Sequence, residues 1–580
     1  YNNRMFVEAK SGGVVELSQV RQIVDRTDGD TDYRTITISA DGPSSLVKLD
    51  ALVNLIDRYG DSTSGAGIFS TIVESDGGQI PTPLLTTAVG TRIVRDTAST
   101  HSLSAGLIQG PSFATTQSES GSEGQNSNPQ GLVGQTVRWI GLSGNWSNAA
   151  NWSGGRIPRV DDDVIIEDTG SQLTVTIDSG QVEIRSLTSS ANLTLASGVS
   201  LTLTEPSLVT GITILAPGSR LTSSGTSALF RATGPVTVDG TSLYALAGGK
   251  IDLSSATSYN HAGTGNSQNR YLRAEGVGAV IDLSNVTAIT GGTRYNNRLF
   301  VEALQGGQVD LRGVQSITDP AEGDTDFRSI DVVADGVGSE IRLDALTSYT
   351  DSNAYDFDRG RYSTLTARNG GTVAAPQLTT LAGVNLELGG TGTLEYEQMR
   401  SLTHGRINLW GGQTWRFSSL ENGLSTEVIV THARAEFPEL TTLKHGSLTL
   451  SRGASVDLPE LSNIDGVSLY AGPGVAIRVP SATSYNHAGT GISQNRYLHA
   501  EGVGALIDLS NVTAITGGTR YNNRLFVEAI QGGQVDLRGV QSITDPAEGD
   551  TDHRSIDVVA DGMGSEIRLD ALTSYTDSNA

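Results

Sequence analysis

Residues 365–383 read LTARNGGTVAAPQLTTLAG, and this pattern recurs along the middle of the chain. Equivalent units begin at Leu386, Ile407, Val428 and Leu448, so the spacing between successive starts is nearly constant. Each unit has two short runs of alternating apolar and polar residues with a glycine turn between them. A Leu-x-x-apolar segment and another glycine follow. Alternation with a period of two predicts strands, and three short strands in every unit of this length predict one coil of a parallel β-helix.

A single coil of this length cannot fold alone. Roughly six inward side chains would contribute roughly 1.5–3 kcal/mol each, while ordering about 20 residues costs roughly 1–2 kcal/mol apiece. Stacking changes that balance, because neighbouring coils share one apolar core and exchange backbone hydrogen bonds at about 4.8 Å spacing. We therefore expect an all-β column of stacked coils, right-handed by the rule for parallel crossovers.

The chain also repeats on a longer scale. Residues 255–354 and 481–580 differ at six of one hundred positions, which indicates a recent internal duplication. The differences are Asn266/Ile492, Arg273/His499, Val280/Leu506, Leu304/Ile530, Phe327/His553 and Val337/Met563. A third, diverged relative begins at Tyr1 with YNNRMFVEAK, which parallels YNNRLFVEAL from Tyr295. Because the chain opens inside a repeat, we expect it to be a segment of a longer protein.

Within the duplicated blocks the coils are longer, and the extra residues enter at one point of the coil. In the first block they follow the third strand of each coil, at residues 259–270, 290–298, 318–328 and 350–363. Insertions at one phase of a solenoid predict loops that lie side by side, and we call this row and its copy in the second block the looped edge. Such a row often forms the working face of a repeat protein, although it can also simply fill a corner.

The composition excludes several classes of function. The net charge is −24 and the pI is about 4.7, so the surface repels phosphate backbones and anionic headgroups. We therefore expect neither nucleic-acid binding nor membrane insertion, and no apolar run approaches the length of a membrane-spanning helix. Cysteine is absent, which excludes disulfides and thiolate metal sites.

A change of composition divides the chain. Residues 108–135 are rich in Ser, Gly, Gln and Asn and almost without apolar residues, which is typical of a flexible linker. Residues 1–107 are then expected to be the C-terminal part of one β-helix. Residues 171–580 form a second β-helix, which holds the duplication.

Residues 136–170 lie between the linker and the second β-helix and contain Trp139, Trp146 and Trp152. The first coil of a solenoid exposes an apolar end and open strand edges, so the tryptophans predict a cap. The tryptophan and glycine spacing here, with DDVIIED at 162–168, resembles the start of β-helical domains in very large secreted or surface-exposed bacterial proteins of the autotransporter-adhesin kind. The resemblance covers residues 139–203 in motif. It implies an extracellular, repetitive protein that acts in adhesion or as a structural filament.

Acidic residues recur at alternate positions in glycine-containing segments. They are Asp28, Asp30 and Asp32, then Glu322, Asp324 and Asp326, and the copies Glu548, Asp550 and Asp552. Alternating oxygen donors suit a hard cation such as Ca²⁺. The EF-hand frame and the glycine-rich repeat of calcium-binding β-rolls are both absent, so a calcium site and simple solvated acidity remain as alternatives.

Aromatic and arginine side chains share the looped edge. They are Tyr295, Arg298, Phe327, Arg328, Tyr355, Phe357, Arg359, Arg361 and Tyr362. Planar rings beside guanidinium groups suit a sugar or another protein surface, or they stack on one another. A repeated chain offers many equivalent contacts, which favours protein contact and self-association into a homo-oligomer or fibre over the binding of a surface polysaccharide.

No motif marks a catalytic site. Carboxylates are plentiful, but no pair is singled out as polysaccharide-cleaving β-helices require, and Ser-His-Asp, P-loop and zinc spacings are missing. We therefore expect an extracellular or cell-surface structural or adhesive protein rather than an enzyme, a unit of a surface fibre or matrix that assembles through the looped edge. The alternative is a β-helix that binds or cleaves carbohydrate.

Overall fold

The computed structural model describes residues 4–10, 12–18, 20–25, 35–42, 44–57, 70–75, 77–83, 85, 87–89, 91–94, 134–170, 172–324, 326–352, 362–489, 491–550 and 552–577. The chain divides into two compact units between Pro129 and Gln130, inside the segment expected to be a linker. No helix in the described residues is long and apolar enough to cross a membrane.

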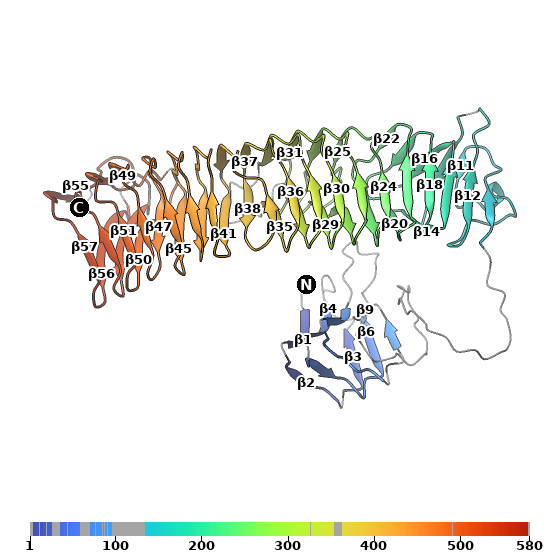
Figure 1. Cartoon of the computed structure of the whole chain (residues 1–580), viewed down its shortest axis with the longest axis horizontal. Helices are drawn as coiled ribbons and strands as arrows, with labels where there is room; N and C mark the ends of the chain where they lie inside the picture. The colour runs from blue at the N-terminus through green and yellow to red at the C-terminus, as the bar shows by residue number, and fades with distance from the viewer. Residues whose placement is uncertain are drawn as a thin grey trace. The chain divides into compact units, whose positions relative to one another are not determined.

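The second unit is a parallel β-helix, as the repeat predicts (Figure 1). Its coils stack into a column that runs from the first strands after residue 134 to the last strands before residue 578. The chain passes in turn through three faces, which we number 1 to 3. Face 1 is one continuous 16-stranded sheet, while faces 2 and 3 are each interrupted into three sheets.

Face 1 consists of β14 (Gln181–Ile184), β17 (Ser200–Leu203), β20 (Arg220–Ser224), β23 (Ser242–Leu246), β26 (Arg270–Glu275), β29 (Arg298–Leu304), β32 (Ser329–Asp335), β35 (Ser363–Arg368), β38 (Val384–Leu388), β41 (Arg406–Trp410), β43 (Glu427–Thr431), β45 (Ser447–Ser451), β47 (Ser468–Ala471), β50 (Arg496–Glu501), β53 (Arg524–Ile530) and β56 (Ser555–Asp561).

Face 2 consists of β10 (Thr136–Arg138), β12 (Asp163–Ile166), β15 (Ser186–Ser189), β18 (Pro206–Val209), β21 (Leu229–Ala232), β24 (Lys250–Asp252), β27 (Val280–Asp282), β30 (Gln308–Asp310), β33 (Glu340–Arg342), β36 (Thr372–Ala374) and β39 (Thr393–Leu394), then β42 (Thr414–Arg416), β44 (Arg434–Glu436) and β46 (Ser455–Asp457), then β48 (Ala476–Arg478), β51 (Leu506–Asp508), β54 (Gln534–Asp536) and β57 (Glu566–Arg568).

Face 3 consists of β11 (Gly144–Asn145), β13 (Thr174–Ile177), β16 (Asn192–Leu195), β19 (Thr213–Leu215) and β22 (Val236–Thr237), then β25 (Tyr259–Asn260), β28 (Ala288–Thr290), β31 (Ser316–Asp319), β34 (Ser348–Asp351), β37 (Thr380–Ala382) and β40 (Ser401–Thr403), then β49 (Ser484–Asn486), β52 (Ala514–Thr516), β55 (Ser542–Asp545) and β58 (Ser574–Asp577).

The first unit has the same three-sided plan in its described residues. One sheet holds β1 (Arg4–Lys10), β4 (Thr35–Asp41), β7 (Ser70–Ser75) and β9 (Thr91–Val94), a second holds β2 (Val14–Glu16) and β5 (Leu46–Lys48), and a third holds β3 (Gln22–Asp25), β6 (Asn54–Asp57) and β8 (Thr87–Val89). The strands pair in parallel here as well. The diverged repeat at the start of the chain thus folds as a short solenoid with its own core.

Alternation along the strands fills the interior of the second unit. In β29, Leu299, Val301 and Ala303 are buried, while the residues between them are partly exposed. Parallel pairing places these side chains over those of the next coil, since Leu299 lies opposite Ile330 and Val301 opposite Val332. One contiguous apolar core therefore extends from Val137 to Ile556.

Residues 136–170 form the first coil and begin the second with β12, and their tryptophans lie in the first coil. β10 pairs with β12, and β11 pairs with β13, so this segment belongs to the column. Trp152 is fully buried and lies edge to face with Trp139 and Trp146, at centroid distances of 4.8 and 4.6 Å. The segment expected to cap the column is thus itself part of the column.

Inward tyrosines on face 3 link neighbouring elements through their hydroxyls. Tyr259 donates to the carbonyl of Thr241 at 2.8 Å, and Tyr485 donates to Val467 at the same distance. Both rings are buried, and this burial raises the pKa of both hydroxyls.

Replacing Tyr485 with Phe should lower the free energy of unfolding by about 1 kcal/mol, because the Val467 carbonyl loses a buried donor. Urea titration followed by circular dichroism measures this change. Tyr575, whose hydroxyl donates to Ile556 at 2.6 Å but whose side chain is exposed, is the matched control. Equal effects of Tyr485→Phe and Tyr575→Phe would contradict the assignment of the cost to burial.

Candidate binding surface

The insertions lie at one corner of the column, between face 3 and face 1. In the first block they connect β25 to β26, β28 to β29, β31 to β32 and β34 to β35. In the second block they connect β49 to β50, β52 to β53 and β55 to β56. The prediction of a common looped edge is confirmed for the described residues, since face 1 orders these strands side by side within each block.

Successive loops are joined by hydrogen bonds that run along the column. The amide of Ser267 donates to the Tyr295 carbonyl at 2.8 Å, and the amide of Asn296 donates to the Asp326 carbonyl at 2.9 Å. The Asn297 side chain accepts from the Gln268 amide at 2.8 Å. These hydrogen bonds therefore join successive loops into one row.

Arg328 is buried inside its own loop, which corrects the expectation that it contacts a partner. Its Nη1 donates to the carbonyls of Gly292 at 2.7 Å and Glu322 at 2.8 Å, and its Nη2 donates to Pro320. The Asp319 carboxylate lies 3.7 Å from Nε. Arg554 repeats these contacts in the second block. A guanidinium that binds loop carbonyls and is fully buried shapes the edge from inside.

The exposed aromatic residues of the edge form pairs. Phe327 is 45% exposed and lies edge to face with Tyr295, with ring centroids 5.6 Å apart. In the second block Tyr521, 38% exposed, forms the same pair with His553 at 5.4 Å. Each row thus presents one ring pair at the same place, although Tyr295 in the first row is only part-exposed.

The other candidates for partner contact have different environments. Arg298 is engaged within the chain, because its Nη2 donates to Asp331 at 2.5 Å and its guanidinium lies over the Phe300 ring. Tyr362 is part-buried, which raises the pKa of its hydroxyl to about 12. Tyr355, Phe357, Arg359 and Arg361 lie outside the described residues.

The acidic residues of the edge do not converge on a cation site. Glu322 and Asp324 are exposed, and the Asp324 carboxylate accepts from the Asp326 amide at 3.2 Å, as Asp550 does from Asp552. Glu548 is likewise exposed. Across the described ranges, no group of three or more His, Asp or Glu side chains is placed to hold a metal ion. Asp28, Asp30 and Asp32 lie outside those ranges.

Face 1 carries a second feature, which sequence reasoning missed. On its outer side the rings of Tyr244, Tyr271 and Phe300 stack along the column, with centroid distances of 5.8 and 4.8 Å. We call these rings the first aromatic ladder. Tyr470, Tyr497 and Phe526 form the second aromatic ladder, which begins just before the second block, at 5.8 and 5.0 Å. The parallel register brings these rings together. It pairs Tyr271 with Phe300, although a whole coil separates them in the sequence.

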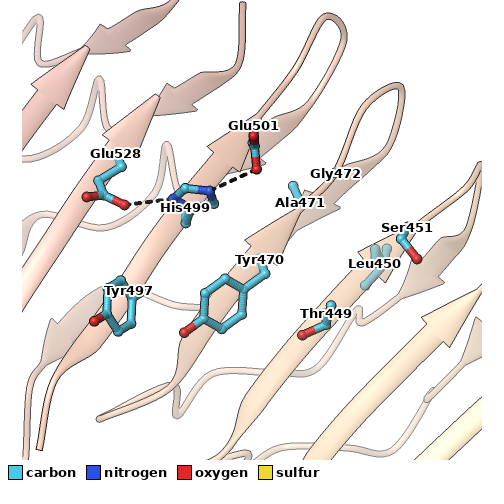
Figure 2. Close-up of a pocket in the computed structure, with 10 residues that line it drawn as sticks. All are labelled: Thr449, Leu450, Ser451, Tyr470, Ala471, Gly472, Tyr497, His499, Glu501 and Glu528. Atoms are coloured by element: carbon cyan, nitrogen blue, oxygen red, sulfur yellow. Dashed lines mark hydrogen bonds and ion pairs between the residues drawn. The ribbon is translucent and has the colours of Figure 1, made fainter. Parts of the chain in front are cut away.

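An open depression of about 590 Å³ lies at the start of the second aromatic ladder (Figure 2). Its walls are Thr449 and Ser451 on one side and Tyr497, His499, Glu501 and Glu528 on the other, with Tyr470 between them. The His499 ring lies between the two carboxylates, with Nδ1 at 2.7 Å from Glu528 and Nε2 at 3.5 Å from Glu501.

No protein-family model, curated protein or solved structure matches the chain.

Proposed function

We propose that this chain is an extracellular structural or adhesive protein that contacts further copies of itself through the looped edge. It acts by binding and not by catalysis, as a unit of a surface fibre or matrix. The observation that carries the proposal is the repetition of one partly to fully exposed ring pair, Tyr295 with Phe327 and Tyr521 with His553, on two loop rows. Exposed aromatic residues on a fixed framework are typical anchors of protein interfaces.

The spacing of the two rows supports assembly. β29 and β53, which follow Tyr295 and Tyr521, are nine steps apart on face 1. At about 4.8 Å a step, the rows lie about 43 Å apart along one column. Two weak contacts on one rigid body reinforce each other, because the second forms at a high effective concentration. A protein with a net charge of −24 repels its own copies, so we expect this association to strengthen as salt screens the repulsion.

The alternative, carbohydrate binding, has less support. A sugar ring binds an aromatic face, whereas Tyr271 and Phe300 lie face to face with their planes 9° apart, so each covers the other. The exposed pairs of the looped edge are edge to face, and they present only a limited platform.

The test is the double variant Tyr295→Ala/Tyr521→Ala. We expect self-association of the full chain to weaken by more than tenfold, because each lost anchor ring costs about 1 kcal/mol or more. Sedimentation velocity over a range of concentrations, with electron microscopy of the assemblies, measures this effect. The control is Val337→Ser, which removes an exposed apolar side chain at the corner between faces 1 and 2. A wild-type chain that stays monomeric, or a double variant that assembles normally, would refute the proposal.

A further inference from the structure

The two aromatic ladders differ at one end. The first is closed by Arg220, whose Cζ lies 4.5 Å from the centre of the Tyr244 ring and whose Nη2 lies 3.4 Å from the Tyr244 hydroxyl. Arg220 stands opposite Ser242 in the register of face 1. In the second ladder the equivalent position, opposite Ser468, is Ser447. The position that carries the guanidinium in the first ladder thus carries a serine hydroxyl in the second. The depression begins two residues further along the same strand, at Thr449, and extends along the Tyr470 ring.

The second ladder also has a histidine where the first has a second arginine. In the first block Arg273 lies over the Tyr271 ring and donates from Nε to Glu302 at 2.6 Å. His499 replaces it in the second block and takes the corresponding partner, Glu528. The carboxylates at these positions are unchanged between the blocks, since Glu275 and Glu302 correspond to Glu501 and Glu528. The second ladder thus has neither of the two guanidinium groups found beside the first, but it keeps both carboxylates.

Two other arginines lie near the second ladder. Arg496 acts electrostatically on Tyr470, but its Nη1 donates to the Asn495 carbonyl at 3.0 Å and it does not line the depression. Arg524 lies over Phe526, at the other end of the ladder, and donates to Asp557 at 2.6 Å. The wall opposite Tyr470 consists of the uncharged side chains of Thr449, Leu450 and Ser451. An aromatic ring edged by two carboxylates and an imidazole attracts a cation with a flat, weakly hydrated face.

We propose that this depression binds an arginine side chain of a protein partner. The guanidinium lies on the Tyr470 ring as Arg220 lies on Tyr244, and Glu501 and Glu528 supply the complementary charge. A guanidinium fits better than a sugar, because the first ladder shows this group on the equivalent ring and because the walls carry net negative charge. The site is on face 1 and is independent of the proposed role of the looped edge.

The test uses the peptide acetyl-Gly-Arg-Gly-amide and its citrulline analogue, which keeps the shape and loses the charge. Saturation-transfer NMR titration of the full chain should show binding of the arginine peptide and at least fivefold weaker binding of the citrulline peptide. Ser447→Arg places an internal guanidinium at the position that Arg220 has beside the first ladder. We expect it to weaken peptide binding at least tenfold while it leaves the fold unchanged, since Arg220 occupies the equivalent position beside Ser242 on face 1.

The reciprocal variant is Arg220→Ser, which uncovers Tyr244. It should add a second and weaker binding site, because the fixed charge of Arg273 remains beside it. Unchanged binding in Ser447→Arg, or equal binding of the citrulline peptide, would overturn the proposal. So would saturation transfer to cellopentaose or chitopentaose that Ser447→Arg abolishes, if the arginine peptide shows none. That result would identify a saccharide site.

Discussion

Lowering the pH from 7 to 4 should loosen the looped edge in both blocks, through His261 and His487. Both imidazoles are fully buried in the first loop of their row. Burial, and the charge of Arg270 beside His261 and of Arg496 beside His487, lower the pKa of each imidazole from 6.5 to about 4. Nδ1 of His261 accepts from the Gly263 amide at 3.1 Å, and His487 does the same with Gly489. A proton on Nδ1 would break that bond.

The sign of this pH effect on stability depends on whether the folded or the unfolded chain binds the proton more tightly. Below pH 6.5 the imidazole of the unfolded chain takes up a proton, whereas the folded loop resists it until about pH 4. Stability is therefore complete above pH 6.5 and falls as the pH drops through this window. The difference between the two pKa values corresponds to about 3 kcal/mol for each histidine, with no further loss below pH 4 from this source.

Hydrogen exchange of residues 259–270 and 485–496, corrected for the intrinsic rate at each pH, measures the loosening. The control is His261→Asn/His487→Asn, since the asparagine oxygen can accept from the same glycine amide and does not titrate in this range. Its loops should exchange at a rate that varies little between pH 7 and 4.5. A wild-type protein whose loops stay equally protected at pH 4.5 would disprove this account.

The sequence predicted the column and the looped edge because both depend on spacing. The units from Leu365 to Leu448 repeat at a nearly constant interval, and every insertion follows the third strand, so phase alone places the loops at one corner. The burial or exposure of single side chains could not be predicted from the spacing. Arg328 and Phe327 are adjacent in the same insertion, but one is buried and the other is 45% exposed. Only the folded loop shows that the Gly292, Pro320 and Glu322 carbonyls converge on the guanidinium.

The aromatic ladders show why register matters more than motif. A longer stretch of chain separates Tyr271 from Phe300 than separates Tyr244 from Tyr271, because the coils differ in length. No fixed period brings the rings of a ladder together. Arg220 and Ser447 likewise correspond only through their partners on face 1, Ser242 and Ser468. These comparisons need the strand pairing, which composition and spacing do not determine.

Replacing Trp152 with Ala should destabilise the first coil by about 3–5 kcal/mol. The side chain is fully buried between Trp139 and Trp146, and its Nε1 donates to the Trp146 carbonyl at 2.8 Å. Its removal leaves a cavity and one unpaired carbonyl at the end of the core. Each coil of a solenoid contacts only its neighbours, so we expect the damage to stay local.

The consequence for the whole protein is aggregation, because fraying of the first coil exposes the strand edges of β12 and β13 to pairing with other chains. Hydrogen exchange should quicken in residues 136–170 and remain unchanged in β29 and beyond, while light scattering rises during incubation. Trp410→Ala is the matched control, since Trp410 is part-exposed on face 1 and its loss opens no buried cavity. If both variants exchange and aggregate alike, the tryptophans of the first coil do not protect the end of the column.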